Sequence, residues 1–188
     1  HTHLPEHKFV KGQPETGVEL AEDLERIAMN FGGENIAACI VEPIAGSTGT
    51  LVPPKGYLKR LREICDKHGI LLIFDEVITG WGRTGSAFAA QEWGVTPDIM
   101  TMAKATTNGV VPMGVVAVKE EMYDTVLDAS KAPEGTPELF HGYTYSGIPV
   151  AVAAALAVQD IFDKEDIFKR AKQMSPYFQD GLHSLKDL

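Results

Sequence analysis

Two residues that could do chemistry stand directly after apolar segments of the kind that form buried strands. Asp75 follows the apolar run 70–74, and Lys104 follows the run 99–103. In an open parallel sheet, ligands bind outside the carboxyl ends of the strands, so residues in these positions are the first candidates for a site. Glu42, after the run 36–41, and Glu76 meet the same condition.

Lys104 and Asp75 together fit one particular chemistry. A lysine removed from water loses its proton more readily and condenses with aldehydes as a nucleophile. Pyridoxal phosphate (PLP) needs such a lysine to form its Schiff base and, in many enzymes, a carboxylate against the pyridine nitrogen. Taken singly, each residue has a plainer interpretation: Lys104 as a surface lysine, and Asp75 as a turn or helix-capping residue.

Two other interpretations come from different functional classes. Asp75 and Glu76 at a strand end would suit the metal site of an ATPase, but that site requires a phosphate-binding loop, and no GxxxxGK[ST] motif occurs in the 188 residues. An inactive chain that acts only in assembly is the third possibility. His1, His3 and His7 lack a second ligand cluster, so we expect solvated histidines and no metal site.

The elements that must position these residues follow from hydrophobic periodicity. Apolar residues recur at helical spacing from Val18 to Phe31, and two glycines then end the pattern. The continuous apolar run 36–41 predicts a strand buried on both faces. A helix over 57–68 and a strand over 70–74 come next. This order predicts parallel strands joined by crossovers, and hence an α/β fold with helices flanking a mostly parallel sheet.

Shorter elements are predicted in the second half of the chain. They are a helix at 87–93, strands at 99–103 and 113–118, and helices at 119–127, 150–162 and 167–185. We expect Ser146 to cap the alanine-rich helix, and Pro176 to bend or break the last one. The polar connection 128–145 is long enough to be functional. Its aromatic residues Phe140, Tyr143 and Tyr145 either line a pocket or anchor this connection.

Composition excludes several classes of partner. Acidic residues outnumber basic ones 26 to 17, which gives a net charge of -9 and no general basic surface for nucleic acid. The longest apolar runs fall far short of the ~20 residues that span a bilayer, and no signal-peptide pattern opens the chain. Cys39 and Cys65 lack CxxC spacing. We therefore expect a cytoplasmic protein with buried, reduced thiols, and neither nucleic acid nor membrane as a partner.

Several motifs resemble those of the class III aminotransferases. The signature region is matched by ILLIFDEV at 70–77, GWGRTG at 80–85, GVTPDI at 94–99, MAK at 102–104 and PMG at 112–114. The match extends through VEP at 41–43, GSTG at 46–49, PPKGY at 53–57 and HGYTYSG at 141–147. The resemblance thus covers nearly the whole chain, and its closest subgroup is the omega-amino acid:pyruvate aminotransferases.

This resemblance implies a role for each of five residues. Lys104 corresponds to the Schiff-base lysine, and Asp75 to the carboxylate that forms a salt bridge with the pyridine nitrogen. Val77 corresponds to an apolar residue packed on one face of the ring, and Glu42 to a glutamate near the substrate entrance. Thr144 matches a threonine that reaches the cofactor phosphate of the neighbouring subunit, which implies a homodimer or a higher homo-oligomer.

Plainer interpretations exist for three of these residues. Val77 would look the same as a core valine, Thr144 as an ordinary loop hydroxyl, and Glu42 as a member of a surface ion pair. One position departs from many family members, because Ile78 stands where a glutamine often contacts the ring hydroxyl. An apolar residue there is usual in the omega-amino acid subgroup.

The implied activity is a PLP-dependent transamination. An amino group would pass from an omega-amino acid or amine to pyruvate, the keto-acid acceptor, by a ping-pong mechanism, with Lys104 as general base and acid. An aminomutase or a decarboxylase with the same cofactor stays an alternative, because the lysine and the aspartate serve all of these reactions.

The resemblance also predicts how the chain is divided. Residues 1–17 would form an extended entry segment, 18–163 part of the large PLP-binding domain, and 164–188 a helix leading toward the small C-terminal domain. The family's phosphate-binding turn, ring-stacking aromatic residue and substrate-binding arginine have no counterpart here. We therefore expect a fragment of the enzyme that is incomplete for turnover on its own.

Overall fold

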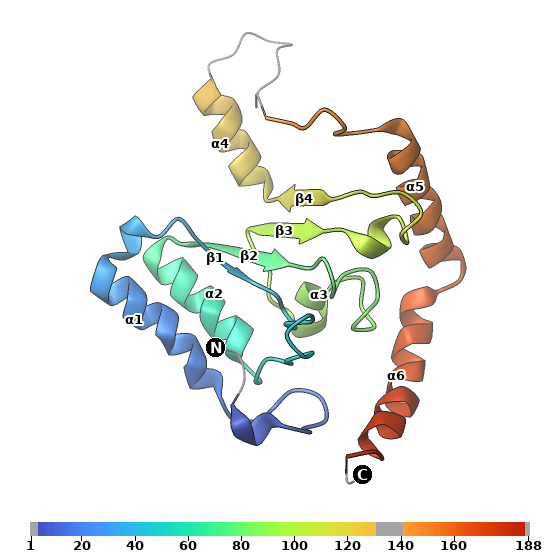
Figure 1. Ribbon diagram of the computed structural model, residues 1–188. Coiled ribbons are helices and arrows are strands. Elements are labelled where there is room, and N and C mark those ends of the chain that lie inside the picture. The colour runs from blue at the N-terminus through green and yellow to red at the C-terminus, as the bar shows by residue number, and fades with distance from the viewer. Residues whose placement is uncertain (1–3, 131–140, 187–188) are drawn as a thin grey trace.

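A four-stranded sheet forms the centre of the fold in the computed structural model, which describes residues 4–130 and 141–186. The strands are β1 (Ala38–Val41), β2 (Leu71–Asp75), β3 (Ile99–Met102) and β4 (Val115–Val118), and they lie in that order (Figure 1). β1, β2 and β3 are parallel, whereas β4 is antiparallel to β3. The predicted α/β class and mostly parallel sheet are confirmed.

Six α-helices and four short 3-10 helices accompany the sheet in the described residues. The α-helices are α1 (Glu22–Phe31), α2 (Tyr57–His68), α3 (Ala89–Trp93), α4 (Glu120–Ser130), α5 (Pro149–Lys164) and α6 (Ile167–His183). The 3-10 helices are η1 (Pro5–His7), η2 (Val18–Ala21), η3 (Gly33–Asn35) and η4 (Lys104–Thr106). Each predicted helix is present, with its ends shifted by a few residues.

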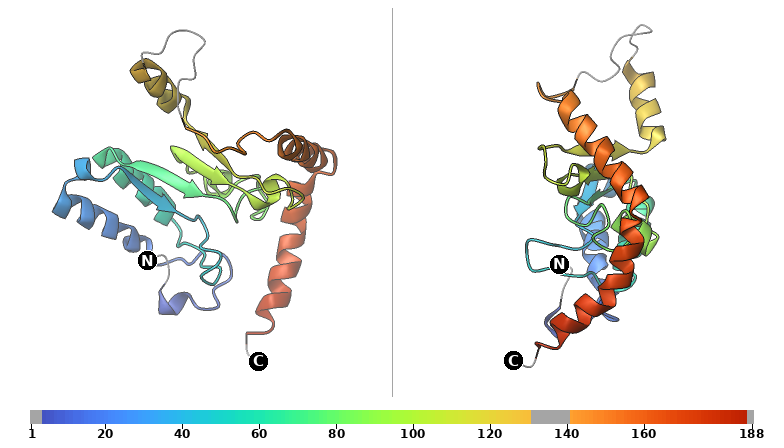
Figure 2. Two further views of the ribbon diagram at one scale, coloured as in Figure 1. Left: turned by 45° about the horizontal axis from the view of Figure 1, so that its top comes forward. Right: turned by 90° about the vertical axis from the view of Figure 1, so that its right-hand side faces the viewer.

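The hydrophobic core lies between one face of the sheet and the helix pair α1 and α2. Leu72 and Phe74 of β2 are fully buried there, against Ile64 and Cys65 of α2. Ala28 of α1 adds a small side chain that lets the two helices approach each other. α5 and α6 lie at the other end of the molecule, away from this pair (Figure 2).

The opposite face of the sheet is open, which corrects one expectation. The segment 36–41 was expected to be buried on both faces, but Ile40 of β1 is 62% exposed. Successive side chains of a strand point to opposite faces, so Cys39 and Val41 pack on the core while Ile40 points away from it. Val116 of β4 is similarly exposed, at 65%.

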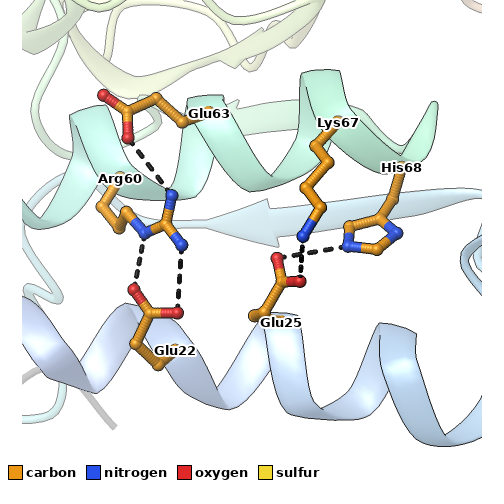
Figure 3. Close-up of polar contacts among 6 residues, drawn as sticks. All are labelled: Glu22, Glu25, Arg60, Glu63, Lys67 and His68. Carbon is orange, nitrogen blue, oxygen red and sulfur yellow. Dashed lines mark hydrogen bonds and ion pairs between the residues drawn. The ribbon is translucent and has the colours of Figure 1, made fainter.

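Ion pairs join α1 to α2 on the outer surface of the helix pair (Figure 3). Arg60 contacts Glu22 through two nitrogens, at 2.5 and 3.1 Å. One turn further along, Glu25 accepts hydrogen bonds from Lys67 and His68. These contacts hold the pKa of both carboxyl groups below their usual values, first through the hydrogen bonds with Arg60 and Lys67.

In the last two helices, Ser146 does not act as the expected cap, and Pro176 does not cause a break. Ser146 does not cap α5, whose N-cap is Ile148; its hydroxyl instead accepts a hydrogen bond from the amide of Tyr143 at 2.9 Å. Pro176 does not break α6, which runs continuously from Ile167 to His183. A proline removes one backbone donor, and the turns on either side carry the helix through.

The remaining expectations concern cysteines, histidines and membranes. Both cysteines are free thiols; Cys65 is buried as expected, but Cys39 is only half-buried. His7 is buried rather than solvated, and its Nδ1 accepts a hydrogen bond from the Leu4 amide. His1, His3 and Phe140 lie outside the described residues. Among the helices of the described segments, none is long and apolar enough to cross a membrane.

Candidate active site

The ends of the three parallel strands bring the main candidates to one edge of the sheet. Glu42 directly follows β1, Asp75 is the last residue of β2, and Lys104 comes two residues after β3. The register pairs Val41 with Phe74, and Asp75 with Thr101. Parallel strands end on the same side of a sheet, so this edge is where the fold predicts a ligand.

Asp75 is held by one of its two carboxylate oxygens. Its Oδ1 accepts hydrogen bonds from the Thr101 hydroxyl at 3.2 Å and from the Val77 amide at 3.1 Å. Within the described part of the chain, Oδ2 accepts no hydrogen bond. A half-buried carboxylate with one fixed and one uncommitted oxygen is suited to receive a cationic N–H group from a ligand.

Lys104 begins the turn η4 and has an unusual backbone conformation. Its φ is +46°, in the left-handed region that residues other than glycine rarely adopt. Sequence analysis placed a desolvated lysine here, but the side chain is exposed. The strained backbone rather than burial is therefore what distinguishes this lysine in the structure, and such strain gathers at functional sites.

A pocket of about 500 Å³ lies next to this edge of the sheet; Thr101 and Ala103 line it, whereas Asp75 and Lys104 themselves do not. Its walls come from separate parts of the chain: Val77 after β2, residues 101–103 and 112–116, and Tyr143, residues 145–148 and Ala151 at the start of α5. Tyr143 and Tyr145 are thus pocket-lining residues, one of the two roles considered for them. The volume falls in the range of small-molecule sites, about 300 to 1,000 Å³.

Glu42 and Thr144 do not line the pocket either. Glu42 is half-buried, and its Oε2 accepts a hydrogen bond from the Gly46 amide at 3.0 Å. It forms no ion pair within the described segments, so the plainer interpretation as a surface ion pair is not supported. Thr144 is exposed, although Tyr143 and Tyr145 on either side of it both line the pocket.

The Glu76 carboxylate is engaged in hydrogen bonds within the protein, so it has little capacity left to bind a metal ion. Its carboxylate is fully buried and accepts three hydrogen bonds, from the Thr79 hydroxyl and from the amides of Ala89 and Ala90 at the start of α3. It therefore caps a helix across a connection of twelve residues. Within the described residues, no group of three His, Cys, Asp or Glu side chains is placed to hold a metal ion.

Two residues that the structure brings into prominence were missed at the sequence level. Thr101 donates a hydrogen bond to the Asp75 carboxylate. Asp98, directly before β3, is a buried carboxylate with several polar partners. Asp98 is 8% exposed and contacts Arg62 and Lys119, each at 2.7 Å, and the Leu72 amide at 2.7 Å. Burial raises the pKa of the Asp98 carboxyl, but the hydrogen bonds from Lys119, the Leu72 amide and Arg62 outweigh it and leave the pKa below its usual value.

Comparison with known proteins gives a consistent result. The Aminotransferase class-III family matches residues 2–188. The chain is 58% identical over its full length to an omega-aminotransferase of Caulobacter vibrioides, and 51% identical over 99% of its length to a beta-alanine--pyruvate aminotransferase of Pseudomonas aeruginosa. It spans 42% of each of these relatives.

A solved structure agrees in fold as well as in sequence. An amine transaminase from an uncultivated Pseudomonas species, solved in its PLP-bound form, matches with a TM-score of 0.76 and 43% identity, over 84% of this chain and 35% of that one. The lysine and aspartate at the sheet edge, the extent of the family match and the identity to these relatives lead to one assignment: this chain belongs to the class III aminotransferases.

Proposed function

We propose that the protein is a PLP-dependent transaminase that transfers an amino group from an omega-amino acid or amine to pyruvate. The observation that carries the proposal is the placement of Asp75 and Lys104 at the ends of adjacent parallel strands, where the neighbouring residues Val77, Thr101 and Ala103 line a pocket of small-molecule size. The names of the relatives support this substrate class, since they act on omega-amino acids or beta-alanine with pyruvate.

The side chains of the site fit the needs of this cofactor. PLP, when bound, acts as a sink for the electrons of the donor carbon. Asp75 Oδ2 would hold the pyridine nitrogen protonated, while Thr101 and the Val77 amide keep Oδ1 in place. The Val77 side chain, which lines the pocket, would pack against one face of the ring. Glu42 would stand near the substrate entrance.

Lys104 would have two tasks in sequence. Its Nζ would hold the cofactor covalently in the resting protein. When not bonded to the cofactor, the Lys104 amine would take a proton from the donor carbon as general base and give it back as general acid. The exposed position of the side chain leaves room for this exchange.

The assembly and its setting belong to the same proposal. Thr144 is exposed beside the pocket, which suits contact with the cofactor phosphate of a second copy, and so we propose a homodimer or a higher homo-oligomer. Residues 18–163 would belong to the large PLP-binding domain, and the helix after residue 164 would lead to the small domain. The two free thiols suit a cytoplasmic location.

The decisive experiment uses the full-length protein loaded with PLP. Borohydride reduction followed by peptide mapping is expected to find the cofactor attached to Lys104. Lys104→Ala is expected to abolish alanine formation from pyruvate and an omega-amino acid donor, a loss of at least about a thousandfold for a residue that acts in covalent and proton-transfer steps.

Lys59→Ala provides the matched control, because Lys59 is an exposed lysine of α2 far along the chain from the site. Its turnover should equal that of the unmodified protein. Attachment of the cofactor to another lysine would contradict the assignment. Donor consumption without formation of alanine and of the aldehyde or ketone derived from the donor would indicate an aminomutase or a decarboxylase.

A further inference from the structure

The backbone of the turn that carries Lys104 requires support from its surroundings. A non-glycine residue at positive φ is strained, and such a conformation persists only where neighbouring contacts impose it. Within the turn, the Thr106 amide donates to the Ala103 carbonyl at 3.0 Å, and the Gly109 amide to the Lys104 carbonyl at 3.3 Å. These are local bonds and do not fix where the turn sits.

A tryptophan from the glycine-rich loop 80–85 supplies a hydrogen bond from outside the turn. The indole Nε1 of Trp81 donates a hydrogen bond to the Thr106 hydroxyl at 2.9 Å. That hydroxyl in turn donates to the carbonyl of Ala103, the residue directly before Lys104, at 3.0 Å. Thr106 is 2% exposed, so water does not compete readily for this relay.

Aromatic packing fixes the orientation of the indole ring itself. Trp81 meets Phe88 edge-on, with ring centroids 5.0 Å apart, and stacks on Phe162 of α5 at 6.0 Å with an interplanar angle of 24°. Phe162 contacts Phe168 of α6 at 5.4 Å. The position of the Lys104 turn is thereby linked, through one indole ring, to the helices α5 and α6.

We propose that Trp81 is a positioning residue for Lys104, acting through Thr106. This inference rests on the proposed function, in which Lys104 binds the cofactor. Without the indole N–H, the buried Thr106 hydroxyl loses its donor, the turn is no longer anchored to the loop, and the Lys104 Nζ spends less time at the position where it moves the proton.

Trp81→Phe tests the inference in the full-length, PLP-loaded protein, because phenylalanine keeps an aromatic ring and lacks the N–H group. We expect kcat for amine transfer to fall about five- to tenfold, the effect of one buried hydrogen bond, with KM for the donor unchanged within about twofold. The pH at which the visible absorbance of the lysine-bound cofactor changes is expected to shift, because the environment of Nζ changes. Trp93→Phe, in α3, is the control and should leave both measurements unchanged.

Variants at Thr106 keep the test decisive if Trp81→Phe fails to fold. Thr106→Val removes the hydroxyl and should reproduce the shifted absorbance titration and the lower kcat, whereas Thr106→Ser keeps the hydroxyl and should restore both. Since the two residues act in one relay, Trp81→Phe combined with Thr106→Val should be no more than about twofold worse than the worse single variant.

The two proposals fail in different ways. Borohydride labelling of a residue other than Lys104 in the unmodified protein overturns the proposed function. Labelling of Lys104, together with an unshifted titration and an unchanged kcat in both Trp81→Phe and Thr106→Val, leaves that function standing and overturns the role of Trp81.

Discussion

Gly46 shows how a single missing carbon shapes the surroundings of the site. A Cβ atom placed on Gly46 would lie 2.6 Å from Cδ1 of Ile78 and 3.1 Å from its Cγ2. We expect Gly46→Ala to lower the free energy of unfolding by about 1 to 3 kcal/mol, because overpacking forces the isoleucine off its preferred rotamer or shifts the backbone. Urea unfolding of the full-length protein measures the change.

A compensating substitution separates this clash from a general effect of alanine. Ile78→Val removes Cδ1, the nearest atom, so the double variant should regain part of the lost stability. Gly181→Ala is the control, since a Cβ atom there meets nothing within 4 Å. An equal loss in the control, or no recovery in the double variant, would show that the clash is not the cause.

Prediction from sequence succeeded at single residues whose signal is local. Asp75 and Lys104 each follow an apolar run, and that pattern alone placed them at the carboxyl ends of strands, as the structure shows. Thr101 and Asp98 carry no such signal. The contact of Thr101 with Asp75 depends on the alignment of two strands that lie about 26 residues apart in sequence. The contact of Asp98 with Arg62 depends on how helix α2 packs against the sheet.

At the scale of elements, Glu76 replaces the N-cap side chain that α3 lacks. Phe88 occupies the N-cap position, and the buried Glu76 carboxylate accepts the amides of Ala89 and Ala90 instead. We expect Glu76→Gln to lower the free energy of unfolding by about 1 to 2 kcal/mol, because a neutral amide offers a single, weaker acceptor to these donors. Hydrogen exchange of the Ala89 and Ala90 amides should accelerate.

Glu92→Gln, in the same helix, is the comparison for this prediction. Glu92 lies near the surface, where it accepts from Ser86 and pairs with Lys172. Surface ion pairs contribute about 0 to 1 kcal/mol to the free energy of unfolding. This variant should therefore leave the rate of hydrogen exchange at the Ala89 and Ala90 amides nearly unchanged. Equal acceleration in both variants would mean that the capping role of Glu76 is wrong.

Element ends were predictable where the chain itself marks them. Gly32 and Gly69 follow α1 and α2 as the sequence suggests, and Gly69 adopts the left-handed conformation of a helix C-cap, with φ of +68°. The direction of β4 was not predictable in this way. An antiparallel partner for β3 is set by the path of the chain through residues 103–114, and no local spacing encodes that path.

At the scale of the whole molecule, α6 docks on the glycine-rich loop through side chains that meet glycines. A Cβ atom on Gly82 would lie 2.9 Å from Phe168, and one on Gly85 would lie 2.5 Å from Lys172. The Lys172 amine also pairs with Glu92 of α3 at 3.2 Å. The glycines of GWGRTG therefore admit a helix from about 90 residues later in the chain, a tertiary contact that no pattern within the loop reveals.

Acid stability follows from carboxylates that join distant parts of the molecule. The pKa values of Asp98, Glu22, Glu25 and Glu92 all lie below their usual values because each accepts hydrogen bonds from cationic or hydroxyl partners. A carboxyl group with a lowered folded-state pKa stabilises fully above its unfolded pKa, about 4, and loses that stabilisation as the pH falls through the folded value. The free energy of unfolding should therefore stay nearly level from pH 7 to about pH 5, and then decline.

Asp98 should account for much of this decline, because its carboxylate joins Arg62 of α2, the Leu72 amide of β2 and Lys119 beyond β4. At pH 7, we expect Asp98→Asn to lower the free energy of unfolding by about 2 to 4 kcal/mol, since two cations lose their buried partner. The gap between Asp98→Asn and the unmodified protein should then narrow as the pH falls below about 4 and through the lowered pKa of Asp98, because the protonated aspartic acid is as neutral as the asparagine that replaces it. Urea unfolding at a series of pH values from 7 downward measures this difference in the free energy of unfolding. Asp124→Asn, on the exposed face of α4, is the control. A gap that stays constant with pH would mean that Asp98 acts through its shape and hydrogen bonds, and not through its charge.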